Sequence, residues 1–262
     1  IMKKLLLILL CLPMIGFGQL TMIPDANFEQ ALINMGYDTG TPNGSVPTAN
    51  INTITHLFVM ANTPSISDLT GIEDFTALTY LSCEVNQLTS LNLSNNTALT
   101  VLECWSNQLT SLDVSENTAL TSLWCESNQL TNLNVSNNIA LTTLSCFSNQ
   151  LNFLNVSQNT ALTYLECGWN LLTSIDVSGA TALAALGCND NQLTSLDVNT
   201  NTALENLFCQ YNPLTSLDVS ANTALTVLDC RYNQLTSLDV SADTALLWLS
   251  CDNNPLTSLD IR

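Results

Sequence analysis

Residues 99–119 read LTVLECWSNQLTSLDVSENTA, and the same 21-residue pattern repeats along most of the chain. The clearest marker of the repeat is cysteine, which recurs every 21 residues without slippage, at Cys83, Cys104, Cys125, Cys146, Cys167, Cys188, Cys209, Cys230 and Cys251. A fixed period of this length is typical of a solenoid, in which each unit buries its apolar face only against its neighbours. The sequence therefore predicts a stack of coils whose function lies on a surface rather than in an enclosed pocket.

Each repeat contains two short segments of alternating polarity, Leu102–Cys104 and Leu112–Val114 in the quoted unit. Alternation of this kind turns one set of side chains inward and their neighbours outward. We therefore expect two short parallel strands per coil, stacked about 4.8 Å apart on the strands of the next coil. A right-handed coil is the default for such parallel crossovers.

The pattern L-x-x-L-x-C-x-x-N-x-L resembles a leucine-rich repeat in which cysteine replaces a leucine, and SISDLTGIED at positions 65–74 resembles the repeats of internalin-like bacterial surface proteins. The unit T-A-L-T-x-L-x-C-x-x-N-Q-L-T-S-L-D-V-S-x-N and the early segment PDANFEQAL are similar to secreted leucine-rich repeat proteins of flavobacteria and their relatives. The resemblance implies a mostly β leucine-rich repeat solenoid and an exported or surface interaction protein, often one used for adhesion.

Residues 1–18 predict a secretory signal peptide, because two lysines precede an apolar run at 5–15 and small residues stand just before Gln19. The apolar run is too short to cross a membrane, so no membrane insertion is expected. A lipoprotein signal at Cys11 is disfavoured, because Leu10 precedes it where a small residue would be expected. These features predict a secreted or cell-surface protein.

The rest of the chain divides into three parts. Residues 19–53 predict an N-terminal capping region with a helix at about 25–36, for which Asp25 supplies the N-cap. Residues 54–77 form an irregular first repeat, and 78–262 form nine 21-residue repeats, the last of which is truncated. We expect the natural chain to continue, because a solenoid normally ends in a polar cap.

Charge and composition exclude several classes of function. The chain has 4 basic and 22 acidic residues, and loss of the predicted signal would leave 2 basic residues and a net charge of −20. Such a surface repels nucleic acid and favours a monomer that stays apart from its copies. One histidine, His56, and no lysine would remain for acid–base or nucleophilic chemistry, so we predict that the protein is not an enzyme.

The repeated cysteines predict a ladder of buried free thiols rather than disulfides. In-register neighbours in parallel strands have Cβ atoms about 4.8 Å apart, whereas a disulfide requires about 3.8 Å. The chain also lacks the C-x-x-C clusters of many metal sites. The cysteines are therefore expected to act as small apolar core residues.

Three polar columns repeat with the cysteines. The first is predicted to point inward and bond the turn after the first strand, and comprises Asn86, Asn107, Asn128, Asn149, Asn170, Asn191, Asn212, Asn233 and Asn254. A second column, from Asn96 to Asp243 with Ala180 as its exception, is expected to serve the opposite bend. A third column is expected to face outward and comprises Asn92, Asp113, Asn134, Asn155, Asp176, Asp197, Asp218, Asp239 and Asp260. It is interpreted as a solvated edge or, alternatively, as a calcium-binding ladder. No other cofactor is predicted.

The candidate binding residues lie at the variable outward positions beside each cysteine. Aromatic side chains collect there, including all four tryptophans, whereas the outward residues of the second segment change little between repeats. Exposed aromatics on one face favour a partner that covers them, although packing against one another is an alternative. The predicted partner-binding residues are Tyr80, Trp105, Trp124, Phe147, Tyr164, Trp169, Phe208, Tyr211, Arg231, Tyr232 and Trp248.

The sequence thus favours a secreted or cell-surface binding module that holds a protein ligand on this face, in the manner of an adhesin. Carbohydrate binding by the same aromatics is the first alternative, and a structural spacer for a further C-terminal domain is the second. Acidic residues beside the aromatics favour a basic or neutral ligand over an anionic one.

Overall fold

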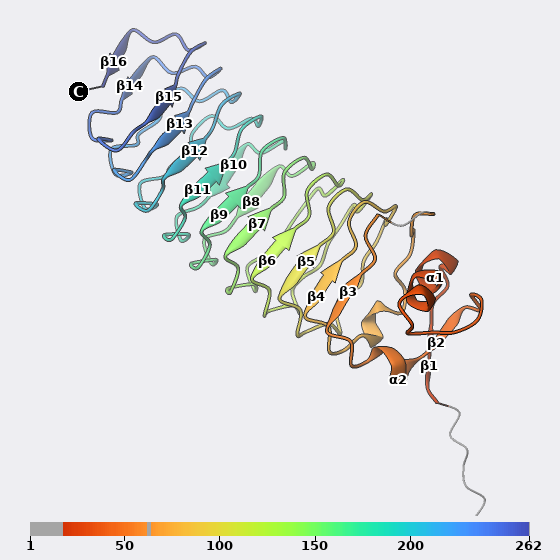
Figure 1. The fold of residues 1–262 in the computed structure, drawn as a ribbon. Helices are drawn as coiled ribbons and strands as arrows, with labels where there is room; N and C mark the ends of the chain where they lie inside the picture. Colours follow the sequence, from red (N-terminus) through yellow and green to blue (C-terminus); the bar gives the residue numbers. More distant parts are fainter. Residues whose placement is uncertain (1–17, 62–63, 262) are drawn as a thin grey trace, which may run out of the picture.

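The computed structural model describes residues 18–61 and 64–261, so the predicted signal peptide lies outside the described residues except for Gly18. The repeats form an elongated stack of coils (Figure 1). The short helices and the first two strands gather at its N-terminal end. Among the described residues, no helix has the length and apolar character needed to span a membrane.

One side of the stack is a ten-stranded parallel sheet, with one strand per coil (Figure 1). Equivalent residues pair in register, so Leu102 lies beside Leu123 and Leu123 beside Leu144. The strands are β3 (His56–Phe58), β4 (Tyr80–Ser82), β5 (Val101–Glu103), β6 (Ser122–Trp124), β7 (Thr143–Ser145), β9 (Tyr164–Glu166), β11 (Ala185–Gly187), β12 (Asn206–Phe208), β13 (Val227–Asp229) and β15 (Trp248–Ser250). The predicted parallel β-solenoid is confirmed.

The opposite side of the stack is less regular than the sequence suggested. Strands form there in four coils of the described chain, where β8 (Phe153–Asn155) pairs with β10 (Ser174–Asp176), and β14 (Ser237–Asp239) with β16 (Ser258–Asp260). In the other coils the equivalent segment, such as Leu112–Val114, still turns its apolar side chains inward but is not paired as a strand. Alternating polarity therefore predicted the inward direction of these residues but not their pairing.

The core lies between the two sides and consists of stacked leucine, valine and cysteine side chains. In the coil that starts at Leu141, the side chains of Leu144, Cys146 and Leu151 have no exposed surface. Burial of a leucine side chain contributes about 1.5 to 3 kcal/mol, whereas ordering each residue costs about 1 to 2 kcal/mol. A coil is therefore stable only with neighbours above and below it.

The first asparagine column ties neighbouring coils together at the turn after the sheet. Asn149 Oδ1 accepts a hydrogen bond from the main-chain N–H of Leu130 in the preceding coil, at 3.0 Å. Its Nδ2 donates to the carbonyls of Cys125 in that coil and Cys146 in its own, at 3.0 and 3.1 Å. The equivalent acceptor bond recurs at every asparagine from Asn86 to Asn254, which confirms the inward, bonded role predicted for this column.

The second asparagine column acts at the opposite bend. Asn117 Nδ2 donates to the carbonyls of Leu93 and Asn96 in the preceding coil, at 3.0 and 2.9 Å. Ala180 interrupts this column and has no side-chain donor, as the sequence indicated. Asp243 ends it within the described chain with a buried carboxylate, neither oxygen of which has a hydrogen-bond partner.

The N-terminal elements pack against the first coil. These are β1 (Leu20–Met22), its antiparallel partner β2 (Ser45–Pro47), α2 (Thr48–Ile51), the 3-10 turn η1 (Ile72–Asp74) and α1 (Ala26–Asn34). Asp25 caps α1, and its other oxygen accepts from the main-chain N–H and the hydroxyl of Ser67 at 2.8 Å. The ring of Phe28 stacks 6.3 Å from that of Phe75. A helix thus stands where the sequence predicted one, and its contacts attach it to the repeats.

The asparagine bonds should be essential to stability. Asn149→Ala leaves one buried N–H and two carbonyls without this partner, so we expect the free energy of unfolding to fall by about 2 to 5 kcal/mol. Urea denaturation followed by circular dichroism measures the change. Gln150→Ala, at an exposed neighbouring position, is the matched control, and an equally small loss in both variants would contradict the assigned role.

Asp243 gives the C-terminal end of the stack a pH dependence. Burial, with a smaller contribution from the charge of Asp239, raises the pKa of Asp243 to about 6 from the ordinary 3.8. Because the pKa of Asp243 is higher in the folded than in the unfolded chain, the folded chain loses stability as the pH rises from 3.8 to about 6. We expect Asp243→Asn to raise the free energy of unfolding by about 1 to 2 kcal/mol at pH 7, since the amide restores the column's donors.

The increase in the free energy of unfolding from Asp243→Asn should become smaller toward pH 4, where the wild-type carboxyl group is mostly protonated. Thermal unfolding at both pH values measures it. Asp218→Asn changes the charge equally at an exposed position and should not stabilise the protein. A gain from Asp243→Asn that is absent or independent of pH would contradict this assignment.

Candidate functional site

The outward face of the ten-stranded sheet carries the variable residues, and we call it the sheet face. In each coil it consists of the residues on either side of the inward leucine, the residue after the cysteine, and the turn residue before the asparagine. In the coil of β9 these are Tyr164, Glu166, Gly168 and Trp169. The register between strands places equivalent residues of successive coils side by side along the stack.

The structure places all eleven sequence-predicted residues on the sheet face. Five of them are exposed, with exposed fractions of 58% for Trp169, 45% for Tyr211, 44% for Tyr232, 44% for Trp248 and 37% for Tyr164. The other six are partly buried, namely Tyr80, Trp105, Trp124, Phe147, Phe208 and Arg231. The face therefore holds large side chains that no neighbouring coil covers.

Three of the exposed aromatics occupy turn positions with a left-handed backbone. The turn residue has a positive φ in every regular coil, and φ is 52° at Trp169, 56° at Tyr211 and 52° at Tyr232. This conformation costs an L-residue about 1 to 2 kcal/mol, and glycine or asparagine adopts it more readily. Aromatic rings at these strained and exposed positions contribute nothing to the core, which indicates a role at the surface.

Several aromatic rings also pack against one another along the stack. The ring centroids of Tyr211 and Tyr232 are 4.4 Å apart with an interplanar angle of 10°, and those of Phe147 and Trp169 are 6.2 Å apart. The alternative of mutual packing is thus realised in part. The rings nevertheless remain exposed, so packing does not remove the need for an outside partner.

The sequence did not identify two further parts of the aromatic surface. His56 and Phe58 in β3 extend the sheet face, because their rings lie 5.9 and 5.3 Å from that of Tyr80. The 24-residue spacing from β3 to β4 obscured this register, which the pairing of the two strands reveals. Phe153, with an exposed fraction of 50%, lies in β8 on the opposite side and is an exception to the one-sided distribution of aromatics.

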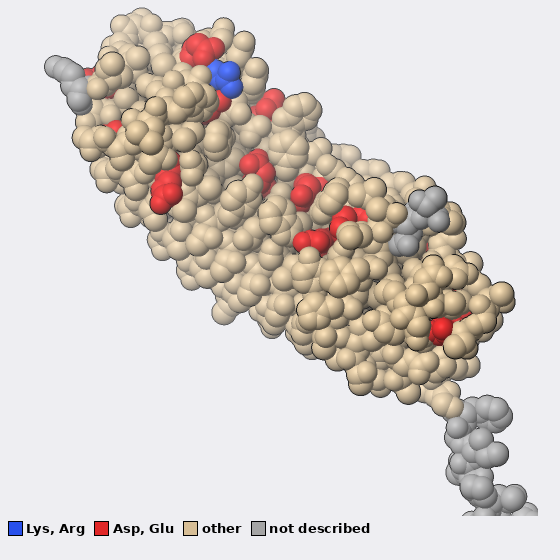
Figure 2. Space-filling view, in the orientation of Figure 1, with Lys and Arg blue, Asp and Glu red and all other residues tan. Residues whose placement is uncertain are grey.

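The sheet face is acidic (Figure 2). Arg231 is the one lysine or arginine among the described residues, and its Nη2 lies 2.8 Å from Oδ2 of the buried Asp229. This ion pair leaves little positive charge free for a ligand, so Arg231 is less available for binding than the sequence suggested. The face also carries the acids Glu103, Glu126, Glu166, Asp190 and Asp252.

The outward column of aspartates and asparagines has a local structural role. Asp113 Oδ1 accepts the main-chain N–H of Ser115 at 2.9 Å, and this bond lowers the pKa of Asp113. Equivalent bonds recur in other coils, for example from Ser178 to Asp176 and from Ser220 to Asp218. Residues 18–61 and 64–261 contain no group of three or more His, Cys, Asp or Glu side chains placed to hold a metal ion.

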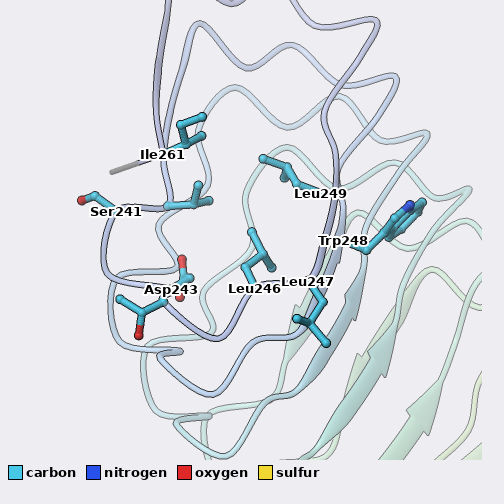
Figure 3. A pocket seen from close by; sticks show the side chains of 9 residues that line it. Ser241, Asp243, Leu246, Leu247, Trp248, Leu249 and Ile261 are labelled. Carbon is cyan, nitrogen blue, oxygen red and sulfur yellow. The ribbon is translucent and has the colours of Figure 1, made fainter.

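A hollow of about 330 Å³ opens at the last coil (Figure 3). Leu246, Leu249 and Ile261 line it together with Asp243. Its lining mixes apolar side chains with Ser241, Thr244 and a single carboxylate, so it lacks a set of groups for acid–base catalysis.

The cysteines form the predicted ladder of free thiols. Eight of them, Cys83 to Cys230, have no exposed surface, whereas Cys251 in the last coil is partly exposed. Burial raises the pKa of these thiols, which keeps them protonated and unreactive at neutral pH. The ladder is therefore a core feature and not a redox site.

The thiol ladder predicts a specific labelling pattern. In a protein of residues 19–262, which lacks Cys11, the folded chain should react with a maleimide at Cys251 alone, and the urea-unfolded chain at all nine repeat cysteines, as counted by mass spectrometry. Cys251→Ser should abolish labelling of the folded protein. Rapid labelling of several thiols in the folded chain would contradict the burial of the ladder.

Comparison with known proteins identifies the architecture. The chain is 37% identical to the functional domain of InlJ from Listeria monocytogenes, which is described as including a cysteine ladder; the match covers 93% of this chain and 61% of that one, with a TM-score of 0.70. The fold is an internalin-like leucine-rich repeat solenoid. No protein-family model matches the chain, and no curated protein matches it.

More distant structures share the fold alone. Internalin InlF from Listeria monocytogenes is 23% identical over 91% of this chain and 89% of its own, with a TM-score of 0.55. The plant peptide hormone receptor RGFR1 in complex with RGF2 is 20% identical over 80% of this chain and 41% of its own, with a TM-score of 0.67. The chain spans about three fifths of the InlJ domain's length.

Proposed function

We propose that this leucine-rich repeat chain is a secreted or cell-surface binding module that holds a protein partner on its sheet face and so mediates adhesion. The observation that carries the proposal is the set of exposed aromatics on this face, three of them at strained turn positions. Similarity to internalins and to a receptor with its peptide ligand supports a protein–protein interaction module outside the cell. That similarity also fits a chain that is not an enzyme.

The shape and composition of the sheet face suit a protein partner. A typical interface buries about 800 Å² on each partner and has aromatic side chains at its energetic centre. The sheet face offers aromatics from β3 to β15, on a platform that the asparagine bonds hold rigid. A partner that covered these rings would remove exposed apolar surface at little cost in conformational entropy.

Carbohydrate binding is the second candidate for the same face. Tyr211 and Tyr232 stack face to face and stay exposed, so the outer face of one ring could stack on a sugar ring. Nearby carboxylates such as Asp190 could accept bonds from its hydroxyl groups. A spacer role for a further C-terminal domain needs no ligand on either side of the stack.

A variant of the turn aromatics tests the proposal. Trp169→Ala, Tyr211→Ala and Tyr232→Ala together should weaken binding to proteins on host or neighbouring cells at least about tenfold, because aromatics at interface centres contribute about 2 kcal/mol or more each. The melting temperature should change little, because alanine keeps the left-handed turn that every coil has and the rings lie outside the core. Binding is measured with surface-protein extracts and, in parallel, on a glycan array.

Phe153→Ala is the matched control, because it removes an equally exposed aromatic from the opposite side. Loss of protein binding in the triple variant alone supports the proposal. Loss of glycan binding alone would favour the second candidate. Equal binding by the wild type, the triple variant and Phe153→Ala would leave the spacer role as the best account.

A further inference from the structure

Two outward positions near the middle of the sheet face hold glycine, and the side chain of Glu166 lies over both. A Cβ added to Gly187 would collide with the Glu166 carboxylate, and one added to Gly168 would lie 2.7 Å from Asn189 Oδ1 and 3.0 Å from Glu166 Oε1. The main-chain N–H of Gly168 donates to Oε1 at 3.2 Å. Because the two glycines have no side chains, the sheet face has a shallow depression there, and the Glu166 carboxylate lies in it against the next coil.

A second carboxylate, that of Glu126, belongs to the same part of the face. Its Oε2 atom is buried and has no hydrogen-bond partner. Burial raises the pKa of both Glu126 and Glu166, and the charge of Glu126 adds to the rise at Glu166. Two carboxylates whose negative charges interact and which are partly removed from water destabilise the free protein unless positive charge balances them.

The described chain supplies no such balance here. Arg231 is the one lysine or arginine among the described residues, and it is bound to Asp229 five coils away from Glu126 along the sheet. A positive charge on a partner would balance the two carboxylates. The excess of negative charge on this part of the sheet face favours a cationic group on the partner.

Aromatic rings flank the two carboxylates. The rings of Trp124 in β6 and Tyr164 in β9 lie 6.1 Å apart across the small residues of β7, and Phe147 contacts Trp169 at 6.2 Å. Glu126 and Glu166 each follow one of the first two rings by two residues. Aromatic faces attract cations, and the methylene stem of a lysine or arginine packs well on such rings.

We infer that this part of the sheet face binds an extended segment of a partner protein through a lysine or arginine side chain, whose charge meets Glu126 and Glu166 while its stem lies against the rings. The inference rests on the proposed function and specifies the partner's chemistry. Charge complementarity with the acidic sheet face supports it, and the glycines at 168 and 187 let the Glu166 carboxylate lie close to the sheet beside the rings.

The test uses residues 19–262 and a displayed library of short random peptides. Peptides selected on the wild-type chain should be enriched in lysine or arginine next to apolar residues. Their affinity should fall about tenfold or more for the double variant Glu126→Gln and Glu166→Gln, as expected for loss of a desolvated charge pair. The control variant, Glu116→Gln with Asp197→Asn, changes the charge equally at exposed positions on other parts of the coils and should keep full affinity.

A second readout needs no ligand. Because the two carboxylates are unbalanced in the free protein, the double variant should melt at or above the wild-type temperature at pH 7. A clearly lower melting temperature would show that the acids serve the fold, and would overturn the inference.

The remaining outcomes separate this inference from the proposed function. Selected peptides without basic residues, an equal loss in the control variant, or a library without binders would each overturn the basic-side-chain site. If peptides without basic residues are selected and their binding still depends on Trp169, Tyr211 and Tyr232, protein binding by the sheet face is supported and the site at Glu126 and Glu166 is ruled out.

Discussion

The structure depends on the side-chain amide that each coil directs into the turn after its strand. A main chain that bends sharply inside a protein leaves N–H and C=O groups away from water, and each such group needs a partner. Asn149 supplies partners to groups in two coils at once, through Leu130, Cys125 and Cys146. The same bond pattern both closes a coil and joins it to the previous one, so the stack grows with a fixed period.

This constraint separates the inside of the molecule from its surface. Leucine, cysteine and asparagine must recur because each contacts its own equivalent in the next coil, and their replacement disturbs two neighbours as well as one coil. Residues that alternate with them point outward and are free of that requirement. The sheet face can therefore carry Trp169 or Glu166 in one coil and Asp190 or Gly187 in the next without a change of fold.

The sequence was most informative where the repeat itself imposes the structure. The spacing of Cys146 and Asn149 predicted the inward direction of both side chains and the free thiol of the cysteine, and both columns occur as expected. It was less informative where coils differ from one another. The pairing of β8 with β10 and the register of β3 depend on main-chain bonds that alternating polarity does not specify.

The candidate site was predictable only in outline. Outward positions and their aromatic content follow from the repeat, but the stacking of Tyr211 on Tyr232 and the position of Glu166 over Gly187 depend on side-chain conformations across coils. Such contacts arise between residues 21 apart or more, where each coil has its own composition. No rule of the repeat determines them.

The most direct test of this account is amide hydrogen exchange on a variant in which the exposed aromatics of the sheet face are replaced by serine, namely Phe58, Tyr164, Trp169, Tyr211, Tyr232 and Trp248. If asparagine bonds maintain the fold and the face serves recognition, the N–H groups of Leu130 and its equivalents should keep their wild-type protection while partner binding is lost. Loss of that protection would show that the face helps to hold the coils together, and would contradict the separation of architecture from recognition.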